Sequence, residues 1–232
     1  MRIAVLSDIH ANLPALEAVL QKLNTLSYDR IISLGDQVGY GPYPNEVIDI
    51  LRNREVPMVL GNHDAAAVER ITLKMFREPN HSLLAWTRDN LTSENREYLL
   101  RAPLTMEGDN WIAAHSSPVK PENWAYLNSA PVCREVLDKI EKPLCLVGHT
   151  HVPGVIPERI GLFRVQPGYR FVINPGSIGQ PRDGSAMASF GILDTEASTW
   201  EPYNTKWSRG DALEGYQELG IDLKTAKKLL WI

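Results

Sequence analysis

The chain has 232 residues, of which 44% are hydrophobic and 22% are charged, a composition typical of a globular protein with a sizeable core. Its formal net charge of −4 disfavours a broad surface for nucleic acid or anionic membrane, so an anionic ligand would need a local positive site. Two cysteines, Cys133 and Cys145, are too few for a disulfide framework, and no segment has the apolar length of a signal peptide or a membrane span. We therefore expect a cytoplasmic protein.

The first half of the sequence alternates strand-like and helix-like segments. Strands are expected at 2–7, 30–34 and 56–60, and helices at 13–26 and 44–53. In the first of these helices, apolar residues recur every three or four positions, which is the stripe of an amphipathic helix. This pattern predicts an α/β fold in which some strands are parallel.

The second half predicts helices over 62–102, with Thr92 as an N-cap, followed by a second and mainly antiparallel sheet packed on the first. Its strands are expected at 110–114, 144–147, 162–165, 171–174 and 188–193. We expect one domain over 1–232, with 196–232 as a C-terminal extension. Residues 212–232 predict two short helices broken near Gly220 that dock on the core. The alternatives for this tail are a dimer contact and a flap over a site.

Polar side chains follow five of the predicted strands at the point where each strand ends. Because the carboxyl ends of parallel strands meet at one edge of a sheet, we expect these side chains to lie close together. They include five of the six histidines, and only His81, interpreted as a surface or capping residue, lies elsewhere. The side chains are Asp8, His10, Asp36, Asn62, His63, Asp64, His115, His149 and His151.

Seven of these residues form a mixed set of oxygen and nitrogen donors without sulfur: Asp8, His10, Asp36, Asn62, His115, His149 and His151. Such a set suits manganese, iron, nickel or zinc. Seven ligands are too many for a single zinc ion, and they suit two ions roughly 3.5–4 Å apart that share a carboxylate and a water molecule.

The motifs in this order resemble those of the calcineurin-like metallophosphoesterases: "DIH" (8–10), "GDQVGYGP" (35–42), "GNHD" (61–64), His115 and "GHTH" (148–151). The similarity spans about residues 2–195. The stretch "INPGSIGQPRD" (173–183) further resembles a compact bacterial and archaeal branch of that family, whose members are mostly phosphodiesterases. The resemblance implies a four-layer α/β sandwich, in which two packed mixed β-sheets are flanked by helices.

The resemblance also implies a role for each ligand. Asp8, His10 and His151 would hold one divalent ion, Asn62, His115 and His149 would hold the other, and Asp36 would bridge both. Two such ions keep a net charge of about +2 after the two carboxylates are counted, and they lower the pKa of a bridging water toward about 7. His63 would stay free of metal and protonate the departing oxygen.

Four further residues are candidates around the reaction. Asp64 either orients the His63 ring or caps the helix that follows. Ser177 and the neighbouring backbone amides are expected to face a phosphate, and Arg182 a second one, although a strand-connecting loop explains the glycines there as well. Tyr40 either borders the substrate or belongs to a simple turn.

The sequence therefore predicts a dinuclear-metal hydrolase of a small soluble phosphate ester, a phosphodiesterase rather than a monoesterase. The alternatives are a phosphomonoesterase or protein serine/threonine phosphatase of the same fold, and a protein-binding scaffold without activity. The presence of every ligand and of His63 argues against the scaffold. The acidic balance disfavours a nuclease, and a homo-oligomer is left open.

Overall fold

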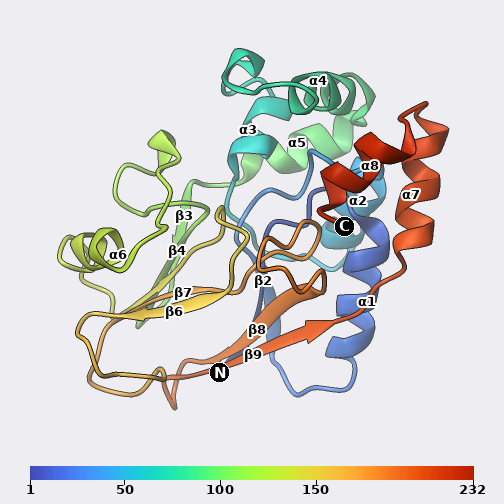
Figure 1. Cartoon of the computed structure of the whole chain (residues 1–232). Helices are drawn as coiled ribbons and strands as arrows, with labels where there is room; N and C mark the ends of the chain where they lie inside the picture. Colours follow the sequence, from blue (N-terminus) through green and yellow to red (C-terminus); the bar gives the residue numbers. More distant parts are fainter.

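Two β-sheets form the centre of the computed structural model, which describes all residues from 1 to 232 (Figure 1). The first sheet has the order β2-β1-β8-β9, and in it β1 and β2 are parallel whereas the other pairs are antiparallel. Its strands are β1 (Arg2–Leu6), β2 (Arg30–Ser33), β8 (Ala188–Asp194) and β9 (Thr199–Thr205).

The second sheet has the order β3-β4-β5-β7-β6. Its three central strands are parallel to one another, and the two edge strands are antiparallel to their neighbours. The strands are β3 (Thr105–Glu107), β4 (Trp111–Ala114), β5 (Leu144–Leu146), β6 (Gly154–Pro157) and β7 (Phe171–Asn174).

Alternation along the strands produces two apolar faces on the first sheet. Ile3 and Val5 of β1 pack between the sheets, where they meet apolar residues of the second sheet such as Phe171. Ala4 and Leu6 point to the opposite face and join the core beneath the helices. This separation follows from the two-residue period of a β-strand, and it makes β1 buried on both sides.

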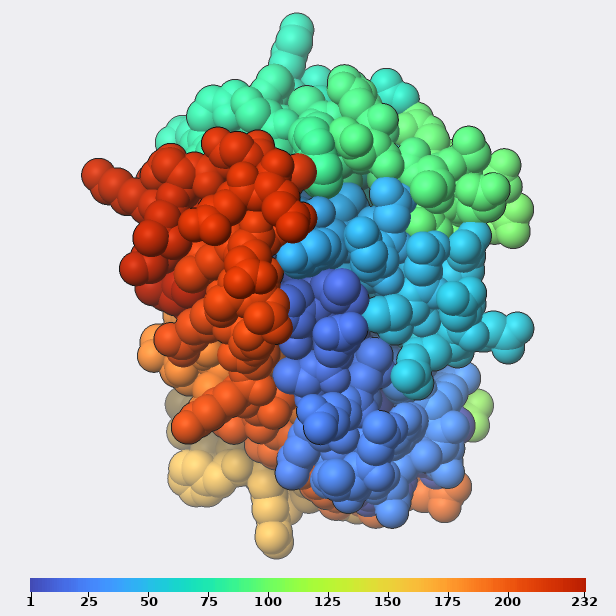
Figure 2. Space-filling model, turned by 90° about the vertical axis from the view of Figure 1, so that its right-hand side faces the viewer, coloured from blue at the N-terminus to red at the C-terminus, as the bar shows by residue number.

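Helices α1 (Leu13–Leu23), α2 (Pro44–Asn53), α7 (Arg209–Glu218) and α8 (Leu223–Leu230) contribute to that second core. The Asn12 side chain accepts a hydrogen bond from the amide of Ala15, which explains why α1 begins there. In α8, Ala226, Leu229 and Leu230 are buried in the same core. Figure 2 shows the C-terminal helices lying along the N-terminal helical layer, so the tail docks on its own chain as expected.

The remaining helices cover the upper end of the molecule and the outer face of the second sheet (Figure 1). The upper group comprises α3 (Asn62–Ala67), the 3-10 turn η1 (Leu73–Met75), α4 (Asn80–Asn90) and α5 (Ser93–Arg101). Thr92 is the N-cap of α5, as predicted, because its hydroxyl accepts from the amide of Asn95. A second 3-10 turn, η2 (Pro121–Asn123), precedes α6 (Ala130–Leu137), which packs on Cys145 and Val172. The result is the four-layer arrangement of helices, sheet, sheet and helix.

Several strand predictions were wrong. The segment 56–60 forms only one bridge, between Ser33 and Met58, because Pro57 has no amide hydrogen for a ladder. The segment 162–165 forms no strand, and the side chain of Phe163 is 96% exposed. The strand β8, expected in the second sheet, belongs to the first one. The second sheet is therefore mixed rather than mainly antiparallel.

No helix of the structure has the length and apolar character needed to cross a membrane.

Candidate metal centre

The predicted ligands meet where the carboxyl ends of the parallel strands of both sheets come together. Asp8 follows β1 and Asp36 follows β2, whereas His115 follows β4 and His149 follows β5. The backbone amide of His149 donates to the Asp8 carboxylate at 3.1 Å, which ties the loop after β5 to the end of β1. The centre thus lies between the two sheets, and each sheet supplies part of it.

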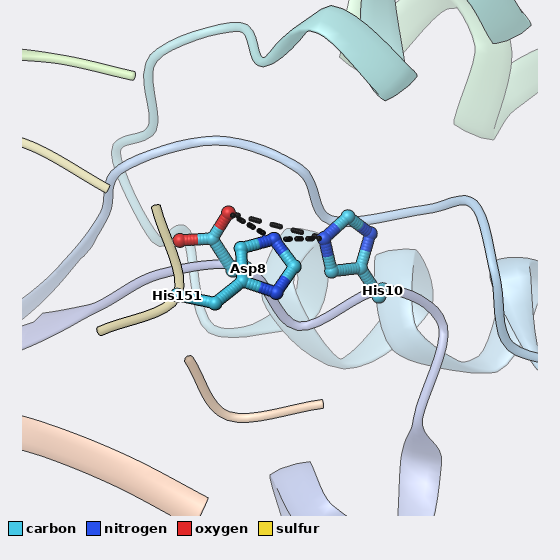
Figure 3. Close-up of side chains that lie close together, drawn as sticks. All are labelled: Asp8, His10 and His151. Carbon is cyan, nitrogen blue, oxygen red and sulfur yellow. Dashed lines mark hydrogen bonds and ion pairs between the residues drawn. The ribbon is translucent and has the colours of Figure 1, made fainter. Parts of the chain in front are cut away.

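Asp8, His10 and His151 form the first group of donors (Figure 3). The Nε2 atoms of His10 and His151 are 3.1 Å apart. Asp8 Oδ1 lies 3.3 Å from His151 Nε2 and 3.8 Å from His10 Nε2. The second oxygen of Asp8, Oδ2, accepts from the Ser7 hydroxyl at 2.6 Å. One carboxylate oxygen and two ring nitrogens therefore face a common point.

Asp36, His115 and His149 form a second group, which Asn62 joins. His115 Nε2 lies 3.1 Å from His149 Nδ1, 3.1 Å from Asn62 Oδ1 and 3.2 Å from Asp36 Oδ2. Asn62 stands at the start of α3, and Gly61 before it lets the chain approach Asp36 closely. A Cβ atom on Gly61 would lie 2.1 Å from Asp36 Oδ1.

Asp36 lies between the two groups. Its Oδ2 atom is 3.2 Å from His115 Nε2 and 3.7 Å from His10 Nε2, so one oxygen faces a histidine of each group. Its other oxygen, Oδ1, accepts a hydrogen bond from the backbone amide of His63 at 2.8 Å. This hydrogen bond orients the carboxylate so that Oδ2 points to the centre.

Backbone carbonyls fix the tautomer of the four histidines in these groups. In each ring, the nitrogen that faces away from the centre lies within hydrogen-bonding distance of a backbone carbonyl oxygen. His10 Nδ1 lies 3.2 Å from the Val38 carbonyl and His115 Nδ1 lies 2.8 Å from that of Leu34. His149 Nε2 lies 3.0 Å from the Trp124 carbonyl and His151 Nδ1 lies 2.7 Å from that of Gln180. A neutral ring donates to its carbonyl and turns a lone pair inward. Facing lone pairs about 3 Å apart repel unless a cation lies between them, so this donor set fits divalent metal ions.

The backbone of these loops is held in a rarely used conformation. Asp8, His10, Asp36, His149 and His151 all have φ angles between 52° and 67°. Residues other than glycine rarely adopt this left-handed conformation, because it costs about 1–3 kcal/mol per residue. Residues held in it concentrate at functional sites. The cost is met by the hydrogen bonds of the surrounding loops, for example from the amide of His10 to the carbonyl of Asp36 at 2.9 Å.

Burial and nearby charges set the protonation of the cluster. Burial lowers the pKa of His149 to about 3 and that of His63 to about 4. It also places the pKa of His10 well below its ordinary value. Although burial acts in the same direction on His115, the Asp36 carboxylate raises its pKa to about 9. A metal ion bound there must displace that proton.

His63 and Asp64 follow Asn62 in α3. The His63 ring is 5% exposed and lies 4.6 Å from the Tyr40 ring and 4.8 Å from the His10 ring. A ring nitrogen of His63 also lies within 4.8 Å of donor atoms of His10 and Asp36, so its freedom from metal stays a prediction. Asp64 accepts from the backbone amides of Gly61, Gln37 and Val38 and not from the His63 ring, which favours the capping role for this carboxylate.

The candidate substrate residues are placed differently from one another. Ser177 is fully buried, and its hydroxyl donates to the backbone carbonyl of Asp8 at 2.8 Å. The amide of Gly179 also donates to that carbonyl. These two hydrogen bonds fasten the loop to the end of β1, and a phosphate contact of the loop around Ser177 stays a prediction. Arg182 and Tyr40, by contrast, line a cavity beside the centre.

Other residues near the centre were not identified from the sequence as metal-site residues. The carbonyls of Leu34, Val38 and Gln180 leave no signal in the sequence, since any residue supplies the same group. The Tyr126 ring lies 4.0 Å from the His149 ring in a stacked orientation. His81 lies outside the cluster, next to Glu78, as expected.

The chain is similar to known proteins in both sequence and structure. The model of the calcineurin-like phosphoesterase superfamily domain matches residues 1–198. The uncharacterized protein MJ0912 of Methanocaldococcus jannaschii is 37% identical over 202 residues, which cover 83% of this chain and 82% of that protein. Phosphodiesterase YfcE of Escherichia coli K12 is 30% identical over 204 residues, covering 84% and 89%. A metallophosphoesterase structure from Sphaerobacter thermophilus has 35% identity and a TM-score of 0.85, covering 99% of this chain and 98% of that one.

Proposed function

Because this chain belongs to the calcineurin-like phosphoesterase superfamily, we propose that it hydrolyses a small phosphodiester with the help of two divalent metal ions. The observation that carries the proposal is the convergence of two donor groups on either side of the Asp36 carboxylate. Each group offers oxygen together with inward-facing imidazole nitrogens, which are the donors that transition metals favour.

Asp8, His10 and His151 hold one ion, Asn62, His115 and His149 hold the other, and Asp36 contacts both. Divalent ions bound in this way supply an activated water for attack on phosphorus and neutralise charge on the phosphoryl oxygens. The carbonyl partners of the imidazoles orient the rings so that the ligand nitrogens face the ions, and at His115 the ion displaces the proton that Asp36 favours. Manganese, iron, nickel and zinc are the candidate metals, and the activity of the protein loaded with each metal in turn distinguishes among them.

His63 is the general acid of the proposed reaction. Because burial lowers the pKa of the free His63 ring to about 4, the ring must take up its proton when the anionic ester binds beside it. As the phosphorus–oxygen bond to the leaving group breaks, the imidazolium donates that proton to the departing oxygen, and the water-derived oxygen remains on phosphorus. Its ring lies beside His10 and under Tyr40, at the margin of the donor groups rather than within one of the assigned sets.

A screen of diesters and monoesters tests the proposed reaction. The protein, freed of metal and reloaded with one metal at a time, is expected to turn over bis(p-nitrophenyl) phosphate faster than p-nitrophenyl phosphate. Asp36→Ala and Asn62→Ala should reduce turnover to background and lower the bound metal measured by elemental analysis. Activity near that of the wild type in both variants would remove the ligand assignments, and a preference for the monoester would assign a phosphatase instead.

The role of His63 is tested by the leaving group. For His63→Gln we expect a loss of about 10²–10⁴-fold on esters of alkyl alcohols and a smaller loss on p-nitrophenyl esters, because an acid matters least where the leaving oxygen needs no proton. His81→Gln, which changes a histidine outside the cluster, is the matched control. Equal losses on both kinds of ester, or loss of a metal ion from His63→Gln, would contradict the general-acid role.

A further inference from the structure

A cavity of about 610 Å³ opens beside the metal centre, a size within the range of small-ligand sites. Its walls come from four separate parts of the chain: the loop after β2, the start of α4, the loop after β7 and the end of α8. Tyr40, Asn80, Arg182, Lys227, Lys228 and Trp231 are among the residues that line it.

The cavity shares a wall with the metal centre. Tyr40 stands between them, with its ring 4.6 Å from the rings of both His10 and His63. The Tyr40 hydroxyl accepts from Asn80 at 3.1 Å and from Arg182 at 3.3 Å. The backbone amide of Arg182 donates to the carbonyl of His151 at 3.2 Å. A group that extends past Tyr40 from the centre therefore enters this cavity.

The cavity is cationic, although the whole chain is acidic. Arg182, Lys227 and Lys228 line it, whereas Glu78 is the only side-chain carboxylate in the lining. Both oxygens of Glu78 are engaged, one by the hydroxyl of Ser82 at 2.9 Å and the other by the amide of the same residue. Glu78 keeps its negative charge, but the three cationic side chains outnumber it, so the lining side chains carry a net positive charge.

The Arg182 guanidinium is held in place, but not all of its hydrogen-bond donors have a partner. Its Nη2 group donates to Tyr40 and, at 2.7 Å, to Gln180 Oε1, and its guanidinium lies 5.5 Å from the centre of the Trp231 ring. Its Nε atom is buried and has no hydrogen-bond partner. A guanidinium that lines the cavity and is held at Nη2 is suited to bind an oxyanion with its remaining accessible N–H groups.

We infer that this cavity binds a second anionic group, a phosphate or a carboxylate, carried by the leaving group of the ester. The inference rests on the proposed function and specifies its substrate class: esters whose alcohol portion is itself anionic. Two of the three cations stand in α8, beyond residues 1–198 that the family model matches, so the C-terminal segment supplies the specificity of this chain.

The test compares two nucleotides that differ by one phosphate. Adenosine 5′-monophosphate and adenosine 3′,5′-bisphosphate are used as inhibitors of bis(p-nitrophenyl) phosphate hydrolysis by the metal-loaded protein. We expect the bisphosphate to inhibit about 10-fold more strongly, since a charge-assisted contact of that kind is worth roughly one order of magnitude. In the double variant Lys227→Ala/Lys228→Ala, the inhibition constants of the two nucleotides should agree within about 2-fold.

Lys224→Ala is the matched control, because Lys224 is exposed in the same helix but does not line the cavity. It should keep the wild-type ratio. The ratio is measured within each variant, so partial unfolding does not change it. Equal inhibition of the wild type by both nucleotides, or an unchanged ratio in the double variant, would overturn the inference while leaving the proposed function intact. If no ester is turned over, calorimetric binding of the same nucleotides measures the same preference, and the proposed function alone fails.

Discussion

The position of the His63 ring depends on the glycine at position 39. Gly39 has a φ angle of 85°, and a Cβ atom added to it would lie 2.3 Å from His63 Nδ1. His63 Nδ1 is buried and has no hydrogen-bond partner, so packing rather than hydrogen bonding holds that side of the ring. Tyr40, next in sequence, covers the ring from another side. The loop after β2 therefore shapes the surroundings of His63, the proposed general acid.

We predict that Gly39→Ala lowers activity by about 10²-fold, because displacement of a catalytic group by about 1 Å has an effect of that size. Gly168→Ala is the control: its φ angle of 81° imposes a similar backbone cost, but nothing lies within 4 Å of the added Cβ. Steady-state kinetics and metal analysis of both variants separate the two effects. If they lose activity equally, the loss comes from backbone strain and not from the His63 ring.

At the scale of elements, the sequence was informative where side chains are buried in a regular pattern. Helix α1 and the helices of the tail followed from their apolar stripes, and four of the five ligand clusters followed from strand ends, the exception being the cluster at Asn62. Strand β9 was missed because it is an edge strand with a polar pattern and a proline at 202. The segment 162–165 was mistaken for a strand because its apolar residues resemble one, although nothing pairs with them.

The hydrogen-bonding contacts between histidine rings and backbone carbonyls could not be predicted from the sequence, for a different reason. The carbonyls that orient the candidate metal-site histidines belong to residues of three different loops, and the identity of those residues does not determine the contact. The cavity beside the centre was missed likewise, because α8 and the loop after β2 are far apart in sequence. Only the fold brings Lys227 near Tyr40.

The docking of α8 predicts a clear difference between two leucines. Leu229 is 4% exposed and packs in the core, and its backbone carbonyl accepts from Gln180 Nε2, whereas Leu223 is 45% exposed. We expect Leu229→Ala to lower the free energy of unfolding by about 2–5 kcal/mol and Leu223→Ala by less than about 0.5 kcal/mol. Urea unfolding of both variants measures these values. Similar midpoints would mean that α8 is not docked as described.

On the scale of the whole molecule, the metal centre joins the two halves of the sandwich. Asp8 and Asp36 extend from the first sheet, and His115 and His149 from the second. Without cations, two buried carboxylates and several buried imidazoles are held together mainly by the surrounding loops. Bound cations would attract groups from both sheets, so metal binding should stabilise the fold as a unit and not only order the centre.

We therefore predict that Mn²⁺ raises the free energy of unfolding of the metal-free wild type by about 2.7 kcal/mol when its concentration is 100 times the dissociation constant. Asp36→Asn should lose most of this gain, because Oδ2 of the Asp36 carboxylate faces a histidine of each donor group. Asp138→Asn, which changes an exposed carboxylate at the end of α6, should keep the full gain. Thermal unfolding with and without Mn²⁺ provides the measurement. An equal Mn²⁺-induced gain in stability in all three proteins would show that the ions bind away from Asp36. The proposal that bound ions hold the two sheets together would then have no basis.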